Sequence, residues 1–388
     1  HLLPLAVDTL EAVLDALFQK ACRDKFILVL DEYTYLRETI TGLDSILQAL
    51  IDKYAQQSKM KLVLCGSFVE TMRGLQFANN PLYGRIDLTI ELQPMDYYES
   101  AAFYPSFSAA DKVRLYSIFG GIPYYNSLID PGKTVRENMI DLLALPGARL
   151  EDEVMVYLHS EFLNMTNVNA VFVALAQGFS RFSDILAQSH ISRNAALSDI
   201  LKKLMRIGMV DKVAPINDSL NKKRTRYVIK DNLACFYYRY LFGYASQLRI
   251  MEAEHFYDRY IKQDFEQNYV PQQFKTICRD YLIRKNRQGK LSIPFEAIGN
   301  YCYTLFRTHQ NGEFDIVTHD DHGDIFYEAM FGKDTITEQM MEHEIKQVNA
   351  TGLHCYRYGF FSQAGCESCE RPDIITYDLQ DLYEPPAD

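Results

Sequence analysis

Two adjacent acids follow an apolar stretch near the start of the chain. Asp31 and Glu32 come directly after residues 26–30, a run with the length and composition of a strand buried in a parallel sheet. At the carboxyl end of such a strand, one acid can hold the Mg²⁺ of a bound nucleotide and the next can orient or deprotonate the attacking water. The alternative is a strand that ends in an ordinary solvated loop, and an isolated match does not separate the two.

A second apolar run of strand length, residues 61–66, ends at Ser67. Helical periodicity precedes each of the two runs, at residues 7–21 and 43–54. The alternation of helix and fully apolar strand predicts a parallel sheet covered by helices on both faces. A third strand is predicted at residues 87–92. Ser67 therefore stands at the end of the strand that neighbours the acid-bearing one.

Three further motifs follow these strands along the chain. They are Asn-Pro-Leu-Tyr-Gly-Arg at residues 80–85, Gln-Pro at 93–94 and Gly-Gly-Ile-Pro-Tyr-Tyr at 120–125. Together with the acids and Ser67, this order resembles the large uncharacterised family of prokaryotic P-loop ATPases. Its members join an AAA/STAND-like ATPase to a winged helix and a C-terminal domain of unknown function. The resemblance covers essentially the whole chain.

The resemblance implies that the complete protein binds ATP with Mg²⁺ and uses hydrolysis as a conformational switch. It places Asp31 on the metal side, Glu32 as the catalytic base and Ser67 as the sensor of the γ-phosphate. The arginine of the third motif is placed to meet phosphate charge, although taken alone it would be read as a surface salt bridge. The Gly-Gly-x-Pro motif begins a lid near the adenine. The implied catalytic and cofactor-binding residues are Asp31, Glu32, Ser67, Arg85, Gly121 and Pro123, with Asp31 also holding the metal.

One element of the family pattern is missing from these residues. No Gly-x-x-x-x-Gly-Lys-Ser/Thr loop occurs, although nucleotide phosphates need a ring of backbone N–H donors and a lysine at a helix start. In the family this loop lies further ahead of the acid-bearing strand than the 25 residues present here. We expect a fragment or a truncated gene, and His1 in place of an initiator Met favours the fragment. The chain alone is not expected to bind ATP tightly.

A basic segment lies in the middle of the chain. Residues 202–230 hold nine Lys and Arg against two Asp, a local charge of +7. Helical patterns at 168–178, 182–188 and 192–208, followed by strands at 209–216 and 224–229, predict a winged helix-turn-helix. Its third helix would enter the major groove of duplex DNA while the wing lies along phosphates. The predicted DNA contacts are Arg193, Asn194, Ser198, Lys202, Arg206, Lys222, Lys223, Arg224 and Arg226.

Two interpretations compete with DNA contact at this segment. Winged helices also serve as protein-docking modules, and a run of charge is often only a solvated face. The prediction of DNA contact depends on the analogy of fold together with the charge.

A third group of acids lies near the C-terminus. If residues 320–323 form a hairpin loop, Asp315 faces Glu328 at about 5 Å on one side of a sheet, a geometry that can share a divalent metal. It resembles the PD-(D/E)xK nuclease core, in which a lysine two residues after the second acid supports the attacking water. Here that position is Met330, and Lys275 stands where the family's helix carries an acid. We expect a nuclease-like fold with weak or absent metal chemistry; an active Mg²⁺-dependent nuclease is a rival interpretation.

These segments predict an α/β protein of several domains. The predicted order is a partial P-loop ATPase core at residues 1–96, a helical lid at 97–157, a winged helix with a linker helix at 158–250 and a PD-(D/E)xK-like domain at 251–388. The predicted function is a nucleotide-dependent ATPase switch. The alternatives are a DNA-binding winged-helix protein with a vestigial ATPase and a Mg²⁺-dependent nuclease.

Composition limits the remaining possibilities. The 388 residues carry a net charge of -11, so a polyanion can bind only through a locally basic patch. Eight cysteines, several inside apolar stretches, suit reduced thiols in the cytoplasm better than a disulfide framework. No apolar run approaches the roughly 20 residues that span a bilayer. AAA-like and STAND-like ATPases often assemble, which makes a homo-oligomer one expectation.

Overall fold

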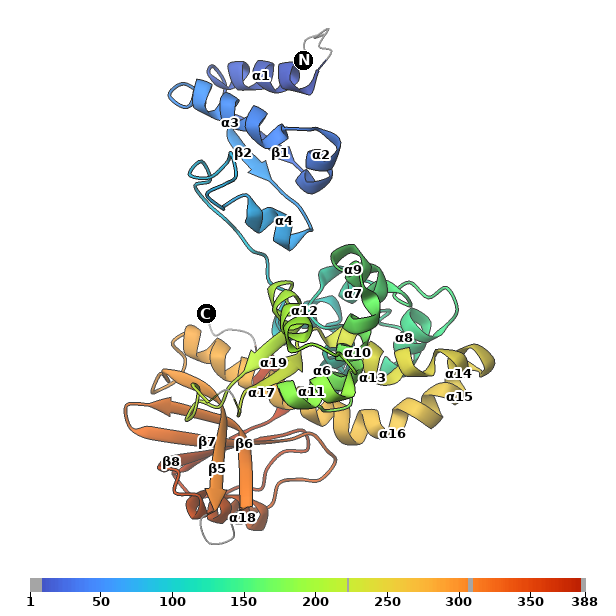
Figure 1. The fold of residues 1–388 in the computed structure, drawn as a ribbon. Coiled ribbons are helices and arrows are strands. Elements are labelled where there is room, and N and C mark those ends of the chain that lie inside the picture. Colours follow the sequence, from blue (N-terminus) through green and yellow to red (C-terminus); the bar gives the residue numbers. More distant parts are fainter. Residues whose placement is uncertain (1–8, 222, 306–309, 385–388) are drawn as a thin grey trace. The chain divides into compact units, whose positions relative to one another are not determined.

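The computed structural model describes residues 9–221, 223–305 and 310–384. The chain is a mixed α/β protein that divides into two compact units, residues 1–92 and 93–388 (Figure 1). The first unit ends at residue 92, and the assignment of residues 1–96 to an ATPase core stays a prediction. Among the described residues, no helix combines the length and the apolar character needed to cross a membrane.

The first unit contains a pair of parallel strands between helices. Strand β1 pairs with β2 in register, with Leu28 opposite Leu62 and Val29 opposite Val63. The parallel pairing of the two predicted strands is as expected. The elements are α1 (Leu10–Ala21), β1 (Ile27–Leu30), α2 (Tyr33–Thr39), α3 (Leu43–Tyr54), β2 (Lys61–Leu64) and α4 (Val69–Gly74).

The core of the first unit lies on one face of this sheet. Leu14 and Phe18 of α1 and Leu47 of α3 are buried there, and Leu28 and Leu62 pack against them. Side chains alternate between the two faces of a strand, so the neighbours of these leucines point to the opposite face. That face is exposed in the described residues, and the expectation of helices on both faces is not met within them.

The predicted third strand, residues 87–92, is absent from the described structure. These residues belong to no helix or strand, and their side chains are exposed. The sequence alternates as a one-sided strand does, but a strand needs a neighbour to satisfy its backbone groups. The prediction is wrong for this chain because no described segment provides that neighbour.

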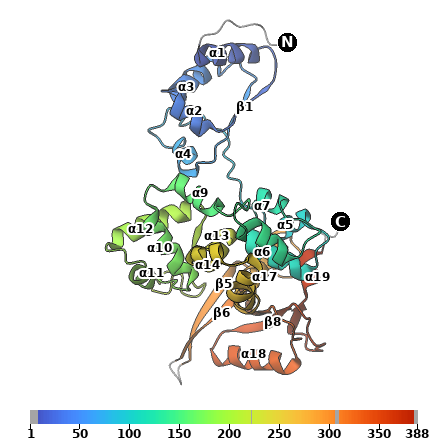
Figure 2. The same ribbon diagram turned by 90° about the vertical axis from the view of Figure 1, so that its right-hand side faces the viewer.

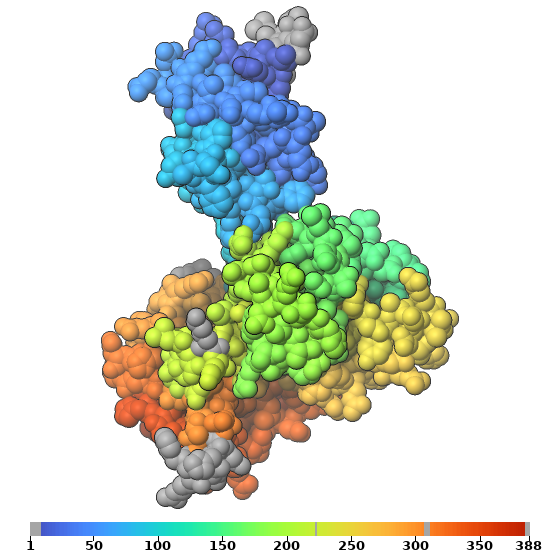
Figure 3. Space-filling model, viewed as in Figure 1, coloured from blue at the N-terminus to red at the C-terminus, as the bar shows by residue number. Residues whose placement is uncertain are grey.

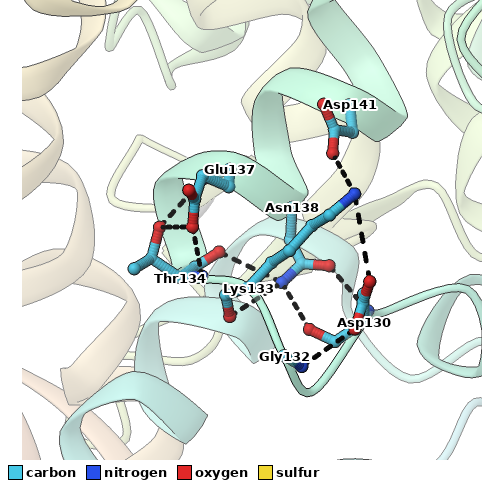
Figure 4. Close-up of polar contacts among 7 residues, drawn as sticks. All are labelled: Asp130, Gly132, Lys133, Thr134, Glu137, Asn138 and Asp141. Atoms are coloured by element: carbon cyan, nitrogen blue, oxygen red, sulfur yellow. Dashed lines mark hydrogen bonds and ion pairs between the residues drawn. The ribbon is translucent and has the colours of Figure 1, made fainter.

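The second unit begins with helices, as expected for residues 97–157. Helix α8 starts after a turn at Gly132, where Thr134 and Glu137 form a capping box and Asn138 donates to three backbone carbonyls (Figure 4). These bonds satisfy backbone carbonyls in the turn before α8 and have a structural role. The helices of this part are α5 (Tyr97–Ser100), a 3₁₀ turn (Ala101–Phe103), α6 (Ala109–Phe119), α7 (Pro123–Ser127), α8 (Val135–Met139), a π-helical turn (Ile140–Ala144) and α9 (Glu153–Glu161).

Three helices and a hairpin follow in the order predicted from the sequence. Strands β3 and β4 pair antiparallel, with Val210 opposite Ile229. Leu197, Leu201 and Leu204 form the buried stripe of α12 because they recur every three or four residues. The green segment that contains these helices forms part of the outer surface in Figure 3. The elements are α10 (Met165–Ala176), α11 (Phe182–Gln188), α12 (Asn194–Arg206), β3 (Val210–Val213) and β4 (Arg226–Ile229).

A series of helices leads from this hairpin to the last sheet. Tyr269 lies in this series and is fully buried, and its hydroxyl donates to the carbonyl of Ser117 at 2.9 Å. The elements are α13 (Asn232–Tyr240), a 3₁₀ turn (Phe242–Tyr244), α14 (Ala245–Ile250), α15 (Ala253–Phe256), a π-helical turn (Tyr257–Ile261), α16 (Lys262–Asp264), a second π-helical turn (Phe265–Tyr269) and α17 (Val270–Arg287).

The C-terminal part is a five-stranded mixed sheet in the order β5-β6-β7-β8-β9. The first three strands pair antiparallel and the last three parallel, with helix α18 in the crossover between β7 and β8. Figure 2 shows the sheet between α17 and α18. The elements are β5 (Ala297–Leu305), β6 (Gln310–Asp320), β7 (Gly323–Met330), α18 (Glu338–Ala350), β8 (Cys355–Ser362), β9 (Ile374–Tyr377) and α19 (Leu379–Tyr383).

Candidate functional site

The carboxyl edge of β1 and β2 brings three predicted residues into one region. Asp31 and Glu32 follow β1, and Ser67 follows β2 three residues after the strand pairing ends at Leu64. The hydroxyl of Ser67 donates to Glu32 Oε2 at 3.2 Å, and both side chains are exposed. Parallel pairing explains this contact, because it places the ends of both strands at the same edge. A serine and a carboxylate that are 35 residues apart therefore share one open polar surface.

An unusual backbone conformation occurs at the two acids, Asp31 and Glu32, where they follow strand β1. Glu32 has φ 48 and ψ 45, a left-handed conformation that non-glycine residues rarely adopt. Asp31 Oδ1 accepts the Glu32 N–H at 3.0 Å, and the Tyr33 N–H donates to the carbonyl of Cys65 at 2.7 Å. Such conformations cost about 1–3 kcal/mol and concentrate at functional positions. The turn thus begins helix α2 immediately after the two acids.

A buried aspartate that the sequence reasoning missed supports helix α2. Asp44 accepts the hydroxyl of Tyr33 at 2.7 Å and both arms of the Arg37 guanidinium, at 2.9 and 2.7 Å. The amide of Asn80 donates to the same carboxylate at 2.8 Å. Burial and the Asp44 contact raise the pKa of the Tyr33 hydroxyl well above its ordinary value. Asp44 thereby connects α2 to α3 and to the turn that starts at Asn80.

The first and last side chains of the Asn-Pro-Leu-Tyr-Gly-Arg motif attach this segment to helix α3 of the first unit. Asn80 binds Asp44, while Arg85 forms a two-pronged ion pair with Asp52 of α3, both contacts at 2.7 Å. Arg85 also donates to the carbonyls of Pro81 and Tyr83. The Arg85 guanidinium thus binds a carboxylate of α3 and two carbonyls of its own turn. Its ion pair with Asp52 is the surface salt bridge that is expected when this arginine is considered without the neighbouring motifs. A phosphate contact by Arg85 stays a prediction.

A cleft of about 700 Å³ opens between α2, the start of α3 and the segment that follows α4. Arg37, Thr71 and Phe77 are among the residues that line it. Thr34, also in the lining, is buried, and its hydroxyl has no hydrogen-bond partner within the described chain. Because α2 begins directly after Glu32, the cleft starts two residues beyond the acid pair.

The Gly-Gly-Ile-Pro motif has a packing role in the second unit. The carbonyl of Gly121 accepts the Met95 N–H at 2.9 Å, and a Cβ atom on Gly121 would lie 1.9 Å from the Met95 carbonyl oxygen. Only glycine permits this close approach of two backbones. Pro123 stands in the first turn of α7, where its missing N–H costs nothing. The adenine contacts of Gly121 and Pro123 stay predictions.

Helix α12 presents several of the predicted DNA-contact residues on its surface. Arg193 precedes the helix, and Arg193, Asn194, Lys202 and Arg206 are exposed, while Ser198 is half-buried. The buried leucine stripe explains this distribution, because these polar residues occupy the remaining helical positions. These polar and basic residues are accessible on the surface of α12, and their contact with DNA stays a prediction.

The hairpin after α12 is engaged by the C-terminal sheet. Asn217 donates to the carbonyl of Cys302 at 2.8 Å and accepts the Cys302 N–H at 3.1 Å. Arg226 forms an ion pair with Glu313 of β6, and Arg224 pairs with Asp218 at 3.4 Å. The predicted phosphate contacts Arg224 and Arg226 thus already have acidic partners. Lys223 is exposed, and Lys222 lies outside the described residues.

The strand register next to the two C-terminal acids is the predicted one, but it ends at Ile316 and Tyr327, so the pairing of Asp315 with Glu328 stays a prediction. Val317 of β6 faces Phe326 of β7, which is the pairing expected from the hairpin. The pairing of β5 with β6 shifts register between Gly299 and Tyr301, so β6 carries an extra residue next to Asp315. Such bulges redirect side chains. The bulge accompanies the exposure of Asp315 on an otherwise buried part of β6.

A lysine side chain supplies a positive charge beside Asp315 and Glu328. Lys275 of α17 contacts Asp315 at 2.5 Å and lies close enough to Glu328 to lower its pKa. Burial nevertheless raises the pKa of Glu328 to about 7, and Glu344 of α18 and Asp315 add to the rise. Within the described residues, no three His, Cys, Asp or Glu side chains are arranged to hold a metal ion. The sequence showed Lys275 but not this contact, which depends on how α17 packs.

Comparison with known proteins gives one family match and one curated relative. Residues 237–347 match DUF234, described as archaeal and bacterial proteins of unknown function. Uncharacterized protein MJECL04 of Methanocaldococcus jannaschii is 27% identical over 369 residues, covering 93% of this chain and 80% of the relative.

Two solved structures are similar at low TM-scores. The Walker-type ATPase PABY2304 of Pyrococcus abyssi has 19% identity and a TM-score of 0.44, covering 60% of this chain and 68% of that one. Protein VC1899 of Vibrio cholerae has 10% identity and a TM-score of 0.21, covering 96% and 92%. At these TM-scores neither likeness defines the fold of this chain.

Proposed function

We propose that the first unit is the metal- and water-handling part of an ATP-hydrolysing site. The observation that carries this proposal is the contact of Ser67 with Glu32 beside Asp31, at the carboxyl edge of two parallel strands. Ligands of α/β proteins bind at this edge because the loops that follow the strands converge there. Bound Mg²⁺ would neutralise charge that develops on the transferred phosphoryl group.

Each of the three residues has a separate task in this site. Asp31 supplies the carboxylate for the metal side. Glu32, held by the left-handed turn, orients the attacking water and accepts its proton. Ser67 holds Glu32 through the 3.2 Å hydrogen bond and is positioned to exchange this bond for one to a phosphate oxygen. Such an exchange would make the hydrogen bonds at the strand ends depend on whether the phosphate is present. This dependence would be the conformational switch.

The phosphates require a group of backbone donors that these residues do not contain. No Gly-x-x-x-x-Gly-Lys-Ser/Thr sequence occurs among the 388 residues. The proposal therefore assigns the phosphate loop to polypeptide outside this sequence. For Arg85 to meet a phosphate it would have to leave Asp52, so its role is secondary to that of the acid pair.

The experiment compares Glu32→Gln with the unaltered protein in a chain that includes the phosphate loop. Loss of the proton acceptor should reduce steady-state ATP hydrolysis at least about 100-fold while ATP binding by calorimetry stays unchanged. Asp24→Asn is the matched control, because Asp24 is exposed and lies ahead of β1. Hydrolysis that survives Glu32→Gln would rule out the assigned role of Glu32.

A second candidate function is binding of duplex DNA by α12. The exposed, basic face of this helix favours it. Neutralising Lys202 and Lys223 should reduce the slope of log affinity against log salt by about 2, since each phosphate contact contributes about 0.9. Lys346→Gln on α18 is the control, because it removes an exposed lysine elsewhere. Absence of binding at low salt would remove this function.

Nuclease chemistry by the C-terminal sheet is the weaker rival. It requires Mg²⁺-dependent cleavage of DNA that disappears in Asp315→Ala. The ion pair of Lys275 with Asp315 places a positive charge at the acid that a metal would use, which favours an inactive domain.

A further inference from the structure

The hairpin that follows α12 is attached to the outer edge of the C-terminal sheet. Strand β5 is the first strand in the order of that sheet, so one of its edges has no strand neighbour among the described residues. The Ile216 N–H donates to the carbonyl of Asn300 at 2.9 Å. The Asn217 side chain binds both backbone groups of Cys302, at 2.8 and 3.1 Å. The hairpin therefore satisfies backbone groups that an edge strand normally leaves open.

An apolar contact adds to the hydrogen bonds between the hairpin and the sheet. Ile216 packs against the buried cluster that the sheet forms with α18. A Cβ atom on Gly299 of β5 would lie 2.9 Å from Ile216 Cγ2, so the glycine permits this close approach. Figure 3 shows the yellow-green hairpin segment beside the orange segment of the sheet. The hairpin backbone is thus held by β5 without any contribution from the hairpin's cations.

Arg226 extends from this hairpin to an acid of the sheet. It begins β4, and its backbone pairs with Val213 of β3. Its guanidinium forms an ion pair with Glu313 of β6, and Glu313 also accepts the side-chain amide of Asn300. The Arg226 side chain is 39% exposed and the Glu313 side chain 16%. The cation is therefore accessible from solvent, while its acidic partner is largely enclosed.

We propose that Glu313 takes the place of a DNA phosphate at Arg226 and thereby keeps this cation out of the contact with duplex DNA. The inference rests on the candidate function of DNA binding and is independent of ATP hydrolysis. A guanidinium binds carboxylate and phosphate oxygens with the same geometry, so the two anions compete for it. The C-terminal sheet thus limits the affinity of the hairpin for DNA through one ion pair.

The effect on DNA binding follows from the charges. With Glu313 in place, the pair has no net charge and contributes little to the sequence-independent attraction of phosphates. Without the acid, Arg226 provides one further cation at a fixed position on the hairpin. The principal competitor is an ion pair whose only role is to hold the hairpin to the sheet.

The salt dependence of DNA binding tests the proposal. The binding of a short labelled duplex is followed by fluorescence anisotropy over a range of salt concentrations. Glu313→Gln should steepen the slope of log affinity against log salt by about 0.9 and raise the affinity at low salt at least about fivefold, because one more phosphate contact releases its counterion. Glu342→Gln, which removes the acidic partner of Lys346 on α18, is the matched control and should leave the slope unchanged. An unchanged slope in Glu313→Gln would overturn the proposal.

A double substitution identifies the cation that Glu313 holds. Arg226→Gln, added to Glu313→Gln, should return the slope and the affinity to those of the unaltered protein, because the released cation is then absent. A gain that persists in the double variant would reflect only the loss of one negative charge and would contradict the proposal.

Hydrogen exchange separates the release of Arg226 from a loosening of the hairpin. The Cys302 N–H donates to the Asn217 side chain, so its exchange rate measures how firmly the hairpin is attached to β5. Glu313→Gln should leave this rate unchanged, whereas Asn217→Ala should raise it at least about 10-fold. Faster exchange in Glu313→Gln would show that the ion pair only holds the hairpin in place and would overturn the proposal.

The remaining outcomes separate this proposal from the candidate function beneath it. DNA binding with equal slopes in the unaltered protein and in Glu313→Gln would keep the function and remove the proposal alone. Absence of DNA binding by both at low salt would remove both. A gain in affinity for poly-L-glutamate without a gain for DNA would identify an acidic protein as the partner of Arg226 and overturn the proposal.

Discussion

The two sheets of this protein differ in how completely their apolar faces are covered. The C-terminal sheet has five strands, with Phe274 of α17 packed on one face and Met341 of α18 on the other. The sheet of the first unit has two strands and is covered by described residues on one face only. Both sheets are built from similar apolar sequences, so the difference lies in which helices the chain provides. A strand sequence alone does not show whether its second face finds a partner.

The largest expected effect comes from a buried ring in the C-terminal sheet. Phe326→Ala removes a phenyl group that is fully buried against α18, and the cavity should cost about 3–5 kcal/mol of unfolding free energy. Denaturant unfolding followed by circular dichroism measures the loss in the second unit. Phe103→Ala, at a half-exposed phenylalanine of the same unit, is the control and should cost much less. Equal losses would show that the C-terminal sheet is no better packed than the surface.

A smaller loss is expected at the buried acid of the first unit. Asp44→Ala leaves Arg37 and Tyr33 without their partner and should cost about 3 kcal/mol. Hydrogen exchange of the α2 backbone amides measures this loss of stability locally, because Asp44 connects that helix to α3. Asp52→Ala breaks an exposed ion pair with Arg85 and should have a far smaller effect. If Asp52→Ala destabilises α2 as much as Asp44→Ala does, the Asp44 cluster does not specifically position α2 and the two acids, Asp31 and Glu32, that precede it.

A pH-dependent effect is expected at Glu328. Its folded pKa of about 7 lies above the ordinary value of about 4.3, so the folded state binds the proton more tightly than the unfolded state. The resulting stability is fully present below about pH 4, falls as pH rises, and is lost above about pH 7. Glu328→Gln should remove this dependence and stabilise the second unit by about 2 kcal/mol at pH 8.

The measurement for Glu328 is a series of denaturant titrations between pH 4 and pH 8. Glu342→Gln, at an exposed position of α18, is the matched control and should follow the wild-type profile. A Glu328→Gln profile parallel to the wild type would show that this carboxyl does not titrate with folding.

The smallest effect is expected on the uncovered face of the first unit. Val29→Ala should change the unfolding free energy of the 388-residue chain by less than about 0.5 kcal/mol, because the side chain is already exposed. Val317→Ala, at a fully buried valine of the C-terminal sheet, makes the same chemical change and should cost about 2 kcal/mol. Thermal unfolding of both variants tests the difference, and equal shifts would remove the contrast between the two sheets.

Much of the local structure was predictable because it depends on residues close together in the sequence. The stripe of Leu197, Leu201 and Leu204 predicts helix α12, and the apolar runs predict β1 and β2. The hairpin register that pairs Val317 with Phe326 also follows from a short polar turn. The prediction of a third strand at residues 87–92 was wrong. The alternating pattern indicates only which side chains a strand there would bury, not whether a neighbouring strand is present to pair with it.

Contacts between distant segments were not predictable in this way. In the Asp44 cluster, Asn80 contacts Asp44 across 36 positions, and Lys275 contacts Asp315 across 40 positions. The hairpin cations that suggested phosphate contact pair with acids such as Glu313, which lies in the C-terminal sheet. No local pattern marks such pairs, since many acids are equally available to each base in the sequence.

The sequence by itself determined the helices, the two apolar strands and the polar residues that end them. Periodicity and composition suffice for these, because they reflect which side chains each segment must remove from water. Only the tertiary structure decided that Ser67 reaches Glu32, that Arg85 is held by Asp52 and that a lysine occupies the C-terminal acid pair. Electrostatic partners depend on distances between segments, and these distances are set by the packing of the whole unit.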